Sequence, residues 1–196
     1  MFPIEQIRPD DVHRQAAQFQ ESVRRYIADA GGNTVPTPAP SVGRFSPRRP
    51  FAMRRWRRNE AGRAQWEGRG VDAIGIASNI QLRRRNLDQA YLYNCNGVTA
   101  AIMILGVRED LSDRFVEIVW LASHPGVAGV GTMMVEKAVS VSESLRFGGV
   151  VQLTSFSDAA TDFYMHLDFR ADETGLKLVP RRSSLWKNKD GVWRFA

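Results

Sequence analysis

The sequence predicts an α/β or α+β fold with a mixed β-sheet at its centre. Three observations predict it: a helical stripe near the amino terminus, a series of strand-like segments from residue 90 onward, and a glycine-rich loop that joins one of these strands to a second helix. Apolar residues make up 43% of the 196 positions, which is enough to bury a sizeable core. Wholesale disorder is therefore excluded.

The amino-terminal segment predicts a short strand followed by an amphipathic helix. Residues 2–8 alternate weakly between apolar and polar side chains, as a strand does. Apolar residues then recur every three or four positions from Val12 to Ile27, and Gly31 interrupts the pattern. We expect a helix over residues 10–30.

A proline- and arginine-rich segment separates this helix from the rest of the chain. Residues 33–50 hold five of the nine prolines and predict an extended, mobile connector. The next helical pattern runs over residues 71–87. The side chains expected to face inward from it are Ile74, Ser78 and Leu82, with Ile76 and Ile80 as further candidates.

The rest of the chain alternates strand and helix signals. Strands are predicted at residues 90–94, 98–107, 115–122 and 150–154, with two or three closing strands after residue 176 that include an Asp190-Gly191 turn. Helices are predicted at residues 130–146 and 158–167. The chain thus divides into an opening strand and helix at 1–32, a Pro/Arg-rich connector or insertion at 33–70, and a main body at 71–196.

Positive charge is concentrated in one stretch. Between Arg44 and Arg85 there are twelve arginines, no lysine and three acidic residues, so this stretch carries a formal +9 while the remainder carries −3. Arginine forks bind phosphate and the interleaved aromatic rings can stack on bases. The stretch therefore predicts a nucleic acid, including the acceptor end of an aminoacyl-tRNA, an acidic protein surface or an anionic membrane as partner. Arginines that merely coat a helix over the core are the alternative.

Cysteine and histidine usage excludes several kinds of site. Cys95 is the only cysteine, which excludes an intramolecular disulfide framework and a cysteine-rich metal site. His13, His124 and His166 lack metal-ligand spacing, so no metal site is predicted. Because the longest apolar stretches fall short of the ~20 residues that cross a membrane, we expect a soluble, cytoplasmic protein, with export as a bacterial effector left open.

The most informative motif is HPGVAGVG, between the strand at 115–122 and the helix at 130–146. Glycines 126, 129 and 131 let backbone amides approach a ligand without an intervening Cβ. The first N–H groups of the following helix have no intrahelical acceptor, so together with the loop they suit a pyrophosphate. A tight strand-to-helix turn without a ligand would use the same glycines.

A second motif, SDAATDFYMHLDF, follows about thirty residues later. Its Ser157, Ala160, Tyr164, Asp168 and Phe169, taken with the glycine loop, resemble the signatures of the GNAT superfamily of acetyl-CoA-dependent N-acetyltransferases. The loop differs from the family pattern in having Gly126 in place of Arg or Gln. The second motif differs in having Ser157 in place of Asn and Asp168 in place of Gly.

The resemblance implies a central, mixed but mostly antiparallel twisted sheet flanked by helices, with acetyl-CoA beside a strand that ends in a splayed bulge. The pantetheine arm would pair with the backbone of one strand end, and the pyrophosphate would lie on the loop. The residues at these two places are Leu121, Ala122 and Ser123, and then Val127, Ala128, Gly129, Val130, Gly131 and Thr132. Ser157 would offer a hydroxyl to the pantetheine or simply cap its helix.

The same resemblance implies roles for two catalytic residues. Tyr164 occupies the position of a tyrosine that protonates the leaving thiolate, with a buried packing role as the alternative. Glu117 is the candidate base, because strand alternation places it on one face with Val119 and Leu121. A solvated strand residue is the alternative for Glu117.

The predicted function is acetyl transfer to an amine of a protein, a small molecule or an aminoacyl-tRNA. The alternative is a non-catalytic module of this fold that binds nucleic acid or an acidic partner.

Overall fold

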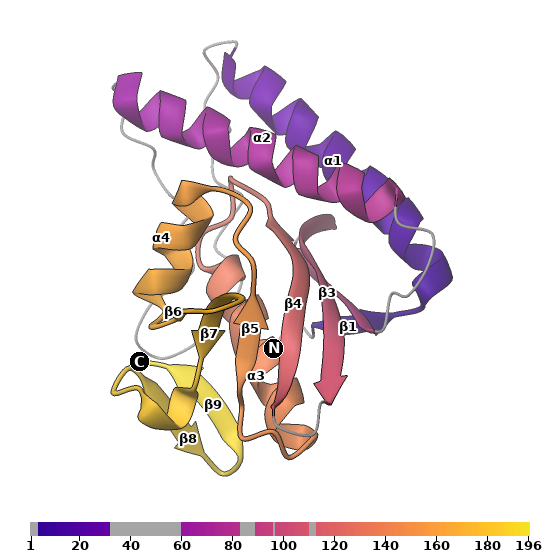
Figure 1. Ribbon diagram of the computed structural model, residues 1–196. Helices are drawn as coiled ribbons and strands as arrows, with labels where there is room; N and C mark the ends of the chain where they lie inside the picture. Colours follow the sequence, from indigo (N-terminus) through magenta and orange to yellow (C-terminus); the bar gives the residue numbers. More distant parts are fainter. Residues whose placement is uncertain (1–3, 32–59, 83–88, 96, 110–112) are drawn as a thin grey trace.

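A seven-stranded sheet forms the centre of the fold and carries helices on both faces (Figure 1). The computed structural model describes residues 4–31, 60–82, 89–95, 97–109 and 113–196. The strands, in chain order, are β1 (Glu5–Ile7), β2 (Gln89–Cys95), β3 (Val98–Glu109), β4 (Arg114–Ser123), β5 (Val151–Leu153), β6 (Arg170–Asp172) and β7 (Gly175–Leu178). Their order across the sheet is β1-β2-β3-β4-β5-β7-β6. Only β4 and β5 pair in parallel, so the predicted mixed, mostly antiparallel α/β sheet is confirmed.

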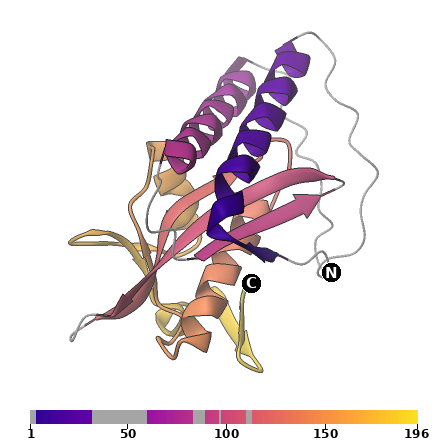
Figure 2. The ribbon, with the colours of Figure 1, turned by 90° about the vertical axis from the view of Figure 1, so that its right-hand side faces the viewer.

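Helices α1 (Pro9–Gly31) and α2 (Glu60–Leu82) lie side by side over one face of the sheet (Figure 2). The predicted stripe of α1 is fully buried at Val12, Ala16, Phe19 and Val23, against the even-numbered side chains of β2 and β3. Because these strands alternate, their odd-numbered side chains pack on the opposite face. The strand and helix predicted at the amino terminus are confirmed.

Helix α2 begins at Glu60 rather than at residue 71, so the predicted start was too late. The glycines around residue 70 lie inside the helix and allow close packing: a Cβ on Gly70 would lie only 2.4 Å from Cδ1 of Ile27 in α1. The expected inward position of Leu82 is also wrong, because its side chain is 79% exposed. Ile76 and Ile80 are buried as expected.

A polar cluster fixes how α2 sits on α1. The Gln20 side chain of α1 donates to Ser78 Oγ at 2.6 Å and to the Ile74 carbonyl at 3.3 Å, and it accepts from Gln81 Nε2 at 3.1 Å. Ser78 therefore faces inward, as predicted. Buried amide groups that find all their partners fix one register between two helices, since any shift would leave them unpaired.

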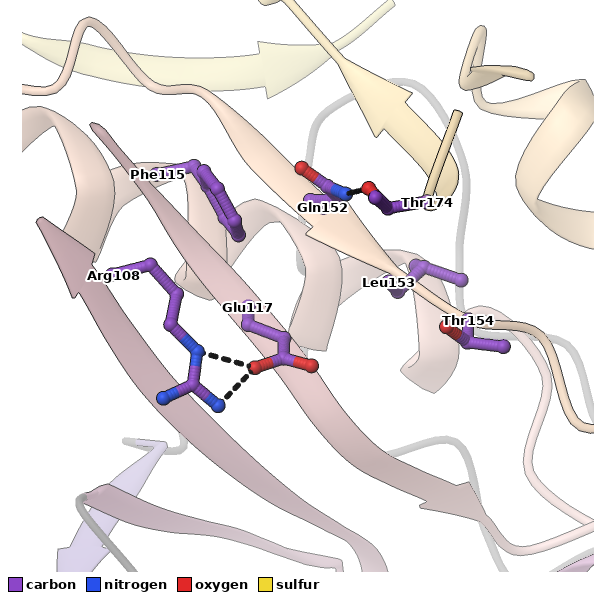
Figure 3. A pocket seen from close by; sticks show the side chains of 7 residues that line it. All are labelled: Arg108, Phe115, Glu117, Gln152, Leu153, Thr154 and Thr174. Atoms are coloured by element: carbon purple, nitrogen blue, oxygen red, sulfur yellow. Dashed lines mark hydrogen bonds and ion pairs between the residues drawn. The ribbon is translucent and has the colours of Figure 1, made fainter. Parts of the chain in front are cut away.

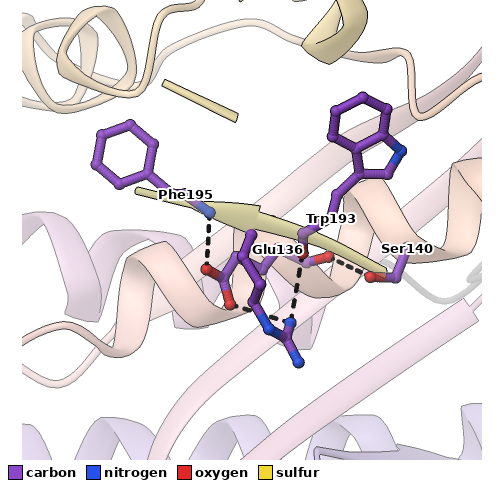
Figure 4. A network of polar contacts seen from close by, with 5 residues as sticks. Glu136, Ser140, Trp193 and Phe195 are labelled. Atoms are coloured by element: carbon purple, nitrogen blue, oxygen red, sulfur yellow. Dashed lines mark hydrogen bonds and ion pairs between the residues drawn. The ribbon is translucent and has the colours of Figure 1, made fainter. Parts of the chain in front are cut away.

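The other face of the sheet packs against α3 (Val130–Ser144) and α4 (Asp158–His166), together with a two-stranded ribbon of β8 (Trp186–Lys189) and β9 (Val192–Phe195). Figure 4 shows how Glu136 of α3 holds the ribbon: its carboxylate accepts from the Phe195 N–H at 3.0 Å and from Arg194 Nη1 at 3.2 Å. Burial raises the pKa of Glu136, and its contacts with Phe195 and Arg194 oppose that rise.

Some expectations concern residues outside the described ranges, namely the connector at 33–50 and the end of the helix at 83–87. Strand β6 was not predicted; it is short, exposed and has no apolar alternation. Among the described helices, none is long and apolar enough to cross a membrane. The Asp190-Gly191 turn is confirmed, with φ of 55° and 79° at its two residues.

Gly175 offers a test of how tightly β7 approaches β5. Its φ is +146°, and a Cβ there would lie 2.4 Å from the backbone oxygen of Leu153, which is held by its own ladder pairing. We expect Gly175→Ala to lower the free energy of unfolding by about 3 kcal/mol or more, measured by urea denaturation. Gly191→Ala is the control: its φ is +79° but its Cβ would meet open space, so about 1–2 kcal/mol is expected. Equal losses in the two variants would contradict the close approach.

Candidate functional site

Strand β4 contains a bulge at Val119. Leu105 of β3 pairs with Ile118 and the preceding Ile104 pairs with Trp120, so Val119 is an extra residue in β4. As a result Val119 and the next residue, Trp120, both pack toward α1 and α2. Leu121 packs in the opposite core, so the expectation that it shares a face with Glu117 and Val119 is wrong for Leu121. An inserted residue reverses the alternation beyond it.

Strands β4 and β5 diverge at the same place. Their parallel pairing covers only Val116–Ile118 against Val151–Leu153, after which β4 runs on to Ser123 while the chain leaves β5 toward α4. On the side away from β3, residues 119–123 of β4 have no strand partner among the described residues. The backbone predicted to pair with a pantetheine arm, at Leu121, Ala122 and Ser123, lies along this edge.

The glycine loop is held by a buried histidine. The His124 Nδ1 accepts a hydrogen bond from the Gly126 N–H at 3.1 Å, and the ring also hydrogen-bonds to the backbone of Ser22 in α1. Because Nδ1 is an acceptor, the hydrogen of the neutral ring is on Nε2. Burial lowers the pKa of His124 to about 4, an effect that the bond to Ser22 partly opposes, so the ring is neutral at pH 7.

Gly126 is required by its packing against α1. A Cβ at this position would lie 2.6 Å from Cζ of Tyr26, whose ring also meets the His124 ring edge-on at 4.9 Å between centroids. Gly126 stands where the GNAT pattern has Arg or Gln. The space that such a side chain would need is occupied by Tyr26 of α1. The loop and α1 form one packed unit.

The loop ends at Gly129, which caps α3 in the left-handed conformation with φ of 79° and leaves the first turn without a side-chain cap. The Val127 N–H already donates to the His124 carbonyl at 3.0 Å, so this amide is committed within the loop. The remaining predicted pyrophosphate residues are Ala128, Gly129, Val130, Gly131 and Thr132. A Cβ on Gly131 would lie 3.1 Å from Cζ of Phe163, which places α4 beside the helix start.

Tyr164 lies in the core on the α3 face of the sheet. Its ring packs edge-on against Phe163 and Phe169, at 5.1 and 5.3 Å between centroids, and the residue is 7% exposed. Within the described part of the chain its hydroxyl makes no hydrogen bond. Burial raises the pKa of Tyr164, so the phenol keeps its proton at neutral pH.

Glu117 lines a cavity of about 250 Å³ on the opposite face of β4 (Figure 3). Its carboxylate Oε2 accepts from Arg108 of β3 at 2.8 Å from Nε and 2.5 Å from Nη2. Contacts between Glu117 and Tyr164 are absent, since the sheet lies between them. The other residues around the cavity are Phe115, Gln152, Leu153, Thr154 and Thr174.

Ser157 caps α4, which is the alternative that the sequence left open. Its hydroxyl accepts from the Ala160 N–H at 3.3 Å and donates to Asp72 of α2 at 2.7 Å. The single proton of Ser157 is therefore committed to Asp72. This bond ties α2 to the start of α4, next to the point where β4 and β5 diverge.

Sequence reasoning missed Arg108, Gln152 and Asp72. Gln152 gave a signal, since it is the only polar side chain within the buried β5. Arg108 and Asp72 gave none, because their importance comes from the partners that the sheet register and the helix packing bring to them. His166 is exposed and packs near Phe195, and Cys95 is half-buried.

Most arginines of the Arg44–Arg85 stretch, which is the predicted partner surface, lie outside the described residues. Nucleic acid and acidic partners stay predictions. In the described part of the chain, no group of three His, Cys, Asp or Glu side chains could hold a metal ion.

A scan against models of known protein families and a search of curated proteins both find no match to this chain. The functional interpretation therefore rests on three features of the structure: the bulged strand, the glycine loop and the cavity.

The buried His124 predicts an acid-sensitive fold. Between its usual pKa near 6.5 and its folded value of about 4, the unfolded chain binds a proton that the folded chain does not. Stability is therefore lost as the pH falls through this window, by up to about 3 kcal/mol from this residue. We expect His124→Gln to remove that component from urea unfolding curves measured between pH 7 and pH 4. His166→Gln, at an exposed helix position, should keep the wild-type profile; an unchanged profile in His124→Gln would contradict the assignment.

Proposed function

We propose that the protein is an acetyl-CoA-dependent N-acetyltransferase of the GNAT type. One observation carries the proposal: beyond its last pair with β5, the bulged strand β4 leads directly into a glycine loop and a start of α3 that has no side-chain cap. The backbone groups at this edge and the N–H groups at the start of α3, separated by loop amides that bond within the protein, fit a ligand that has an amide-bearing arm followed by a pyrophosphate.

Each part of that run has a chemical role in the proposal. The edge of residues 119–123 would hydrogen-bond to the pantetheine amides as a strand does. The N–H groups of residues 128–132 would face the pyrophosphate at the positive end of α3. Acetyl-CoA supplies an activated acetyl group as a thioester when bound.

The transfer forms a bond between the acceptor nitrogen and the acetyl carbon and breaks the bond from that carbon to sulfur. An acceptor ammonium must lose two protons: one goes to solvent before attack, and the other leaves the nitrogen after attack while the thiolate gains a proton. A backbone N–H near the bulge would stabilise the oxyanion of the tetrahedral state. Tyr164, which stays protonated at neutral pH, would deliver the proton to sulfur and would regain one, through solvent, from the proton that the nitrogen releases.

The cavity at Glu117 would receive the acceptor amine. Glu117 lies one residue before the last β4–β5 pair, so the cavity borders the point where the two strands separate. A carboxylate there attracts an ammonium group. Glu117 acts as a base where it accepts the proton that the acceptor ammonium loses, and as a binding group where that proton goes directly to solvent.

Binding of acetyl-CoA is the direct test. Isothermal titration calorimetry should detect it with the full chain, and Thr132→Glu should weaken it by about tenfold or more, because a carboxylate in the first turn of α3 repels the pyrophosphate. The same carboxylate suits a helix N-terminus, so stability should not fall.

Ser144→Glu is the matched control for charge. It adds the same carboxylate at the other end of α3, about 18 Å away at 1.5 Å per residue, and should leave the affinity within about twofold. A folded wild-type protein that does not bind acetyl-CoA would overturn the proposed function.

Tyr164→Phe tests the proton donor. We expect acetyl transfer to slow by about 10²-fold while the dissociation constant of acetyl-CoA stays unchanged, because only the hydroxyl is removed. The unfolding free energy should change by about 0.5 kcal/mol or less, since that hydroxyl makes no hydrogen bond in the described part of the chain. Single-turnover transfer and calorimetry measure the two quantities separately. Full activity in the variant would remove Tyr164 from this role.

A further inference from the structure

We propose that the acyl acceptor is a small molecule of the α-amino acid class, and that Arg108 selects it by binding its carboxylate while Glu117 binds its ammonium. This inference rests on the proposed function for the transfer step, but the binding itself can be measured without acetyl-CoA.

The ion pair between Arg108 and Glu117 leaves one carboxylate oxygen and one guanidinium nitrogen available to a ligand. Both contacts from Arg108, through Nε and Nη2, go to the same carboxylate oxygen, Oε2 (Figure 3). Among the described residues, neither Glu117 Oε1 nor Arg108 Nη1 has a partner. A carboxylate oxygen accepts from an ammonium group, and a guanidinium N–H donates to a carboxylate. The pair therefore offers complementary contacts to a ligand that carries both charges.

Lys177, a second cation near the cavity, contacts two carboxylates, whereas Arg108 contacts a single carboxylate oxygen. Lys177, which pairs in the ladder with Gln152, reaches Asp113 at 2.5 Å and Asp172 at 3.8 Å. Its ammonium also lies 5.8 Å from the ring centre of Phe115, which lines the cavity. Arg108 is left as the cation that can bind an incoming carboxylate, and its side chain is 49% exposed.

The cavity also suits a small polar ligand. Its volume of about 250 Å³ accommodates a single amino acid. Gln152 and Thr174, which hydrogen-bond to each other, and Thr154 supply polar walls, while Phe115 and Leu153 supply apolar ones.

Other amines suit this arrangement less well. A polyamine would bring a second ammonium next to the Arg108 guanidinium, where like charges repel. A protein lysine has no anion beside its amine, so the open edge of Arg108 would bond only to water and add no affinity. An aminoacyl ester presents an α-amine but lacks the carboxylate charge.

Calorimetry on the cofactor-free protein tests the binding. The probes are free L-amino acids, beginning with leucine and extending to all twenty, each compared with its amide, which has the same size but no carboxylate charge. We expect at least one amino acid to bind about tenfold or more tightly than its amide. Arg108→Gln should remove that preference, lowering the affinity for the amino acid by about tenfold and for the amide by less than about twofold.

Arg114→Gln is the matched control, since Arg114 is an exposed arginine of β4 that lies outside the cavity, and it should keep the preference. If no amino acid binds better than its amide, or if Arg108→Gln leaves the preference intact, the inference is overturned even where acetyl-CoA binds. Mass spectrometry of reactions with acetyl-CoA then follows the product. An amino acid that binds but is never N-acetylated overturns its role as acceptor, and acetylation of polyamines or protein lysines alone overturns the proposed selectivity.

Discussion

The bulge at Val119 is the constraint on which the rest of the site depends. An extra residue in β4 bends the strand and increases its local twist, and the pairing with β5 ends at Ile118, the residue just before it. Three consequences come from this one residue: the backbone beyond it loses a neighbour on one side, Val119 and Trp120 face α1 and α2 together, and Leu121 turns to the opposite core.

Two polar contacts, one buried and one partly buried, tie the amino-terminal helices to this opening. His124 links the glycine loop to the backbone of Ser22 in α1, and Asp72 of α2 accepts from Ser157 at the start of α4. Both contacts lie at the ends of the diverging strands, so α1 and α2 fix the loop and the cap rather than merely covering the core. Because unpaired buried polar groups are costly, each contact holds its segment in one position.

The sequence was sufficient for features set by local periodicity. The α1 stripe from Val12 to Val23 and the strand–loop–helix order around Gly129 follow from side-chain spacing and glycine chemistry. Features set by strand register could not be predicted from the sequence. The face on which Leu121 lies depends on which β3 residues pair across the bulge. The contact between Arg108 and Glu117 depends on the same β3–β4 pairing. The start of α2 was missed because a glycine such as Gly70 can serve helix packing as well as break a helix.

The position of Gly126 shows how the proposed pyrophosphate site must work in this chain. Tyr26 fills the space over it, and residues 124–132 contain no lysine or arginine. Attraction for a diphosphate would therefore come from backbone N–H groups and the dipole of α3, whose effect is confined to about the first helical turn. Such a site needs close contact and a fixed loop more than long-range charge. The neutral, buried His124 that fixes the loop is consistent with this requirement, because a charged ring would need a solvated position that leaves the loop unanchored.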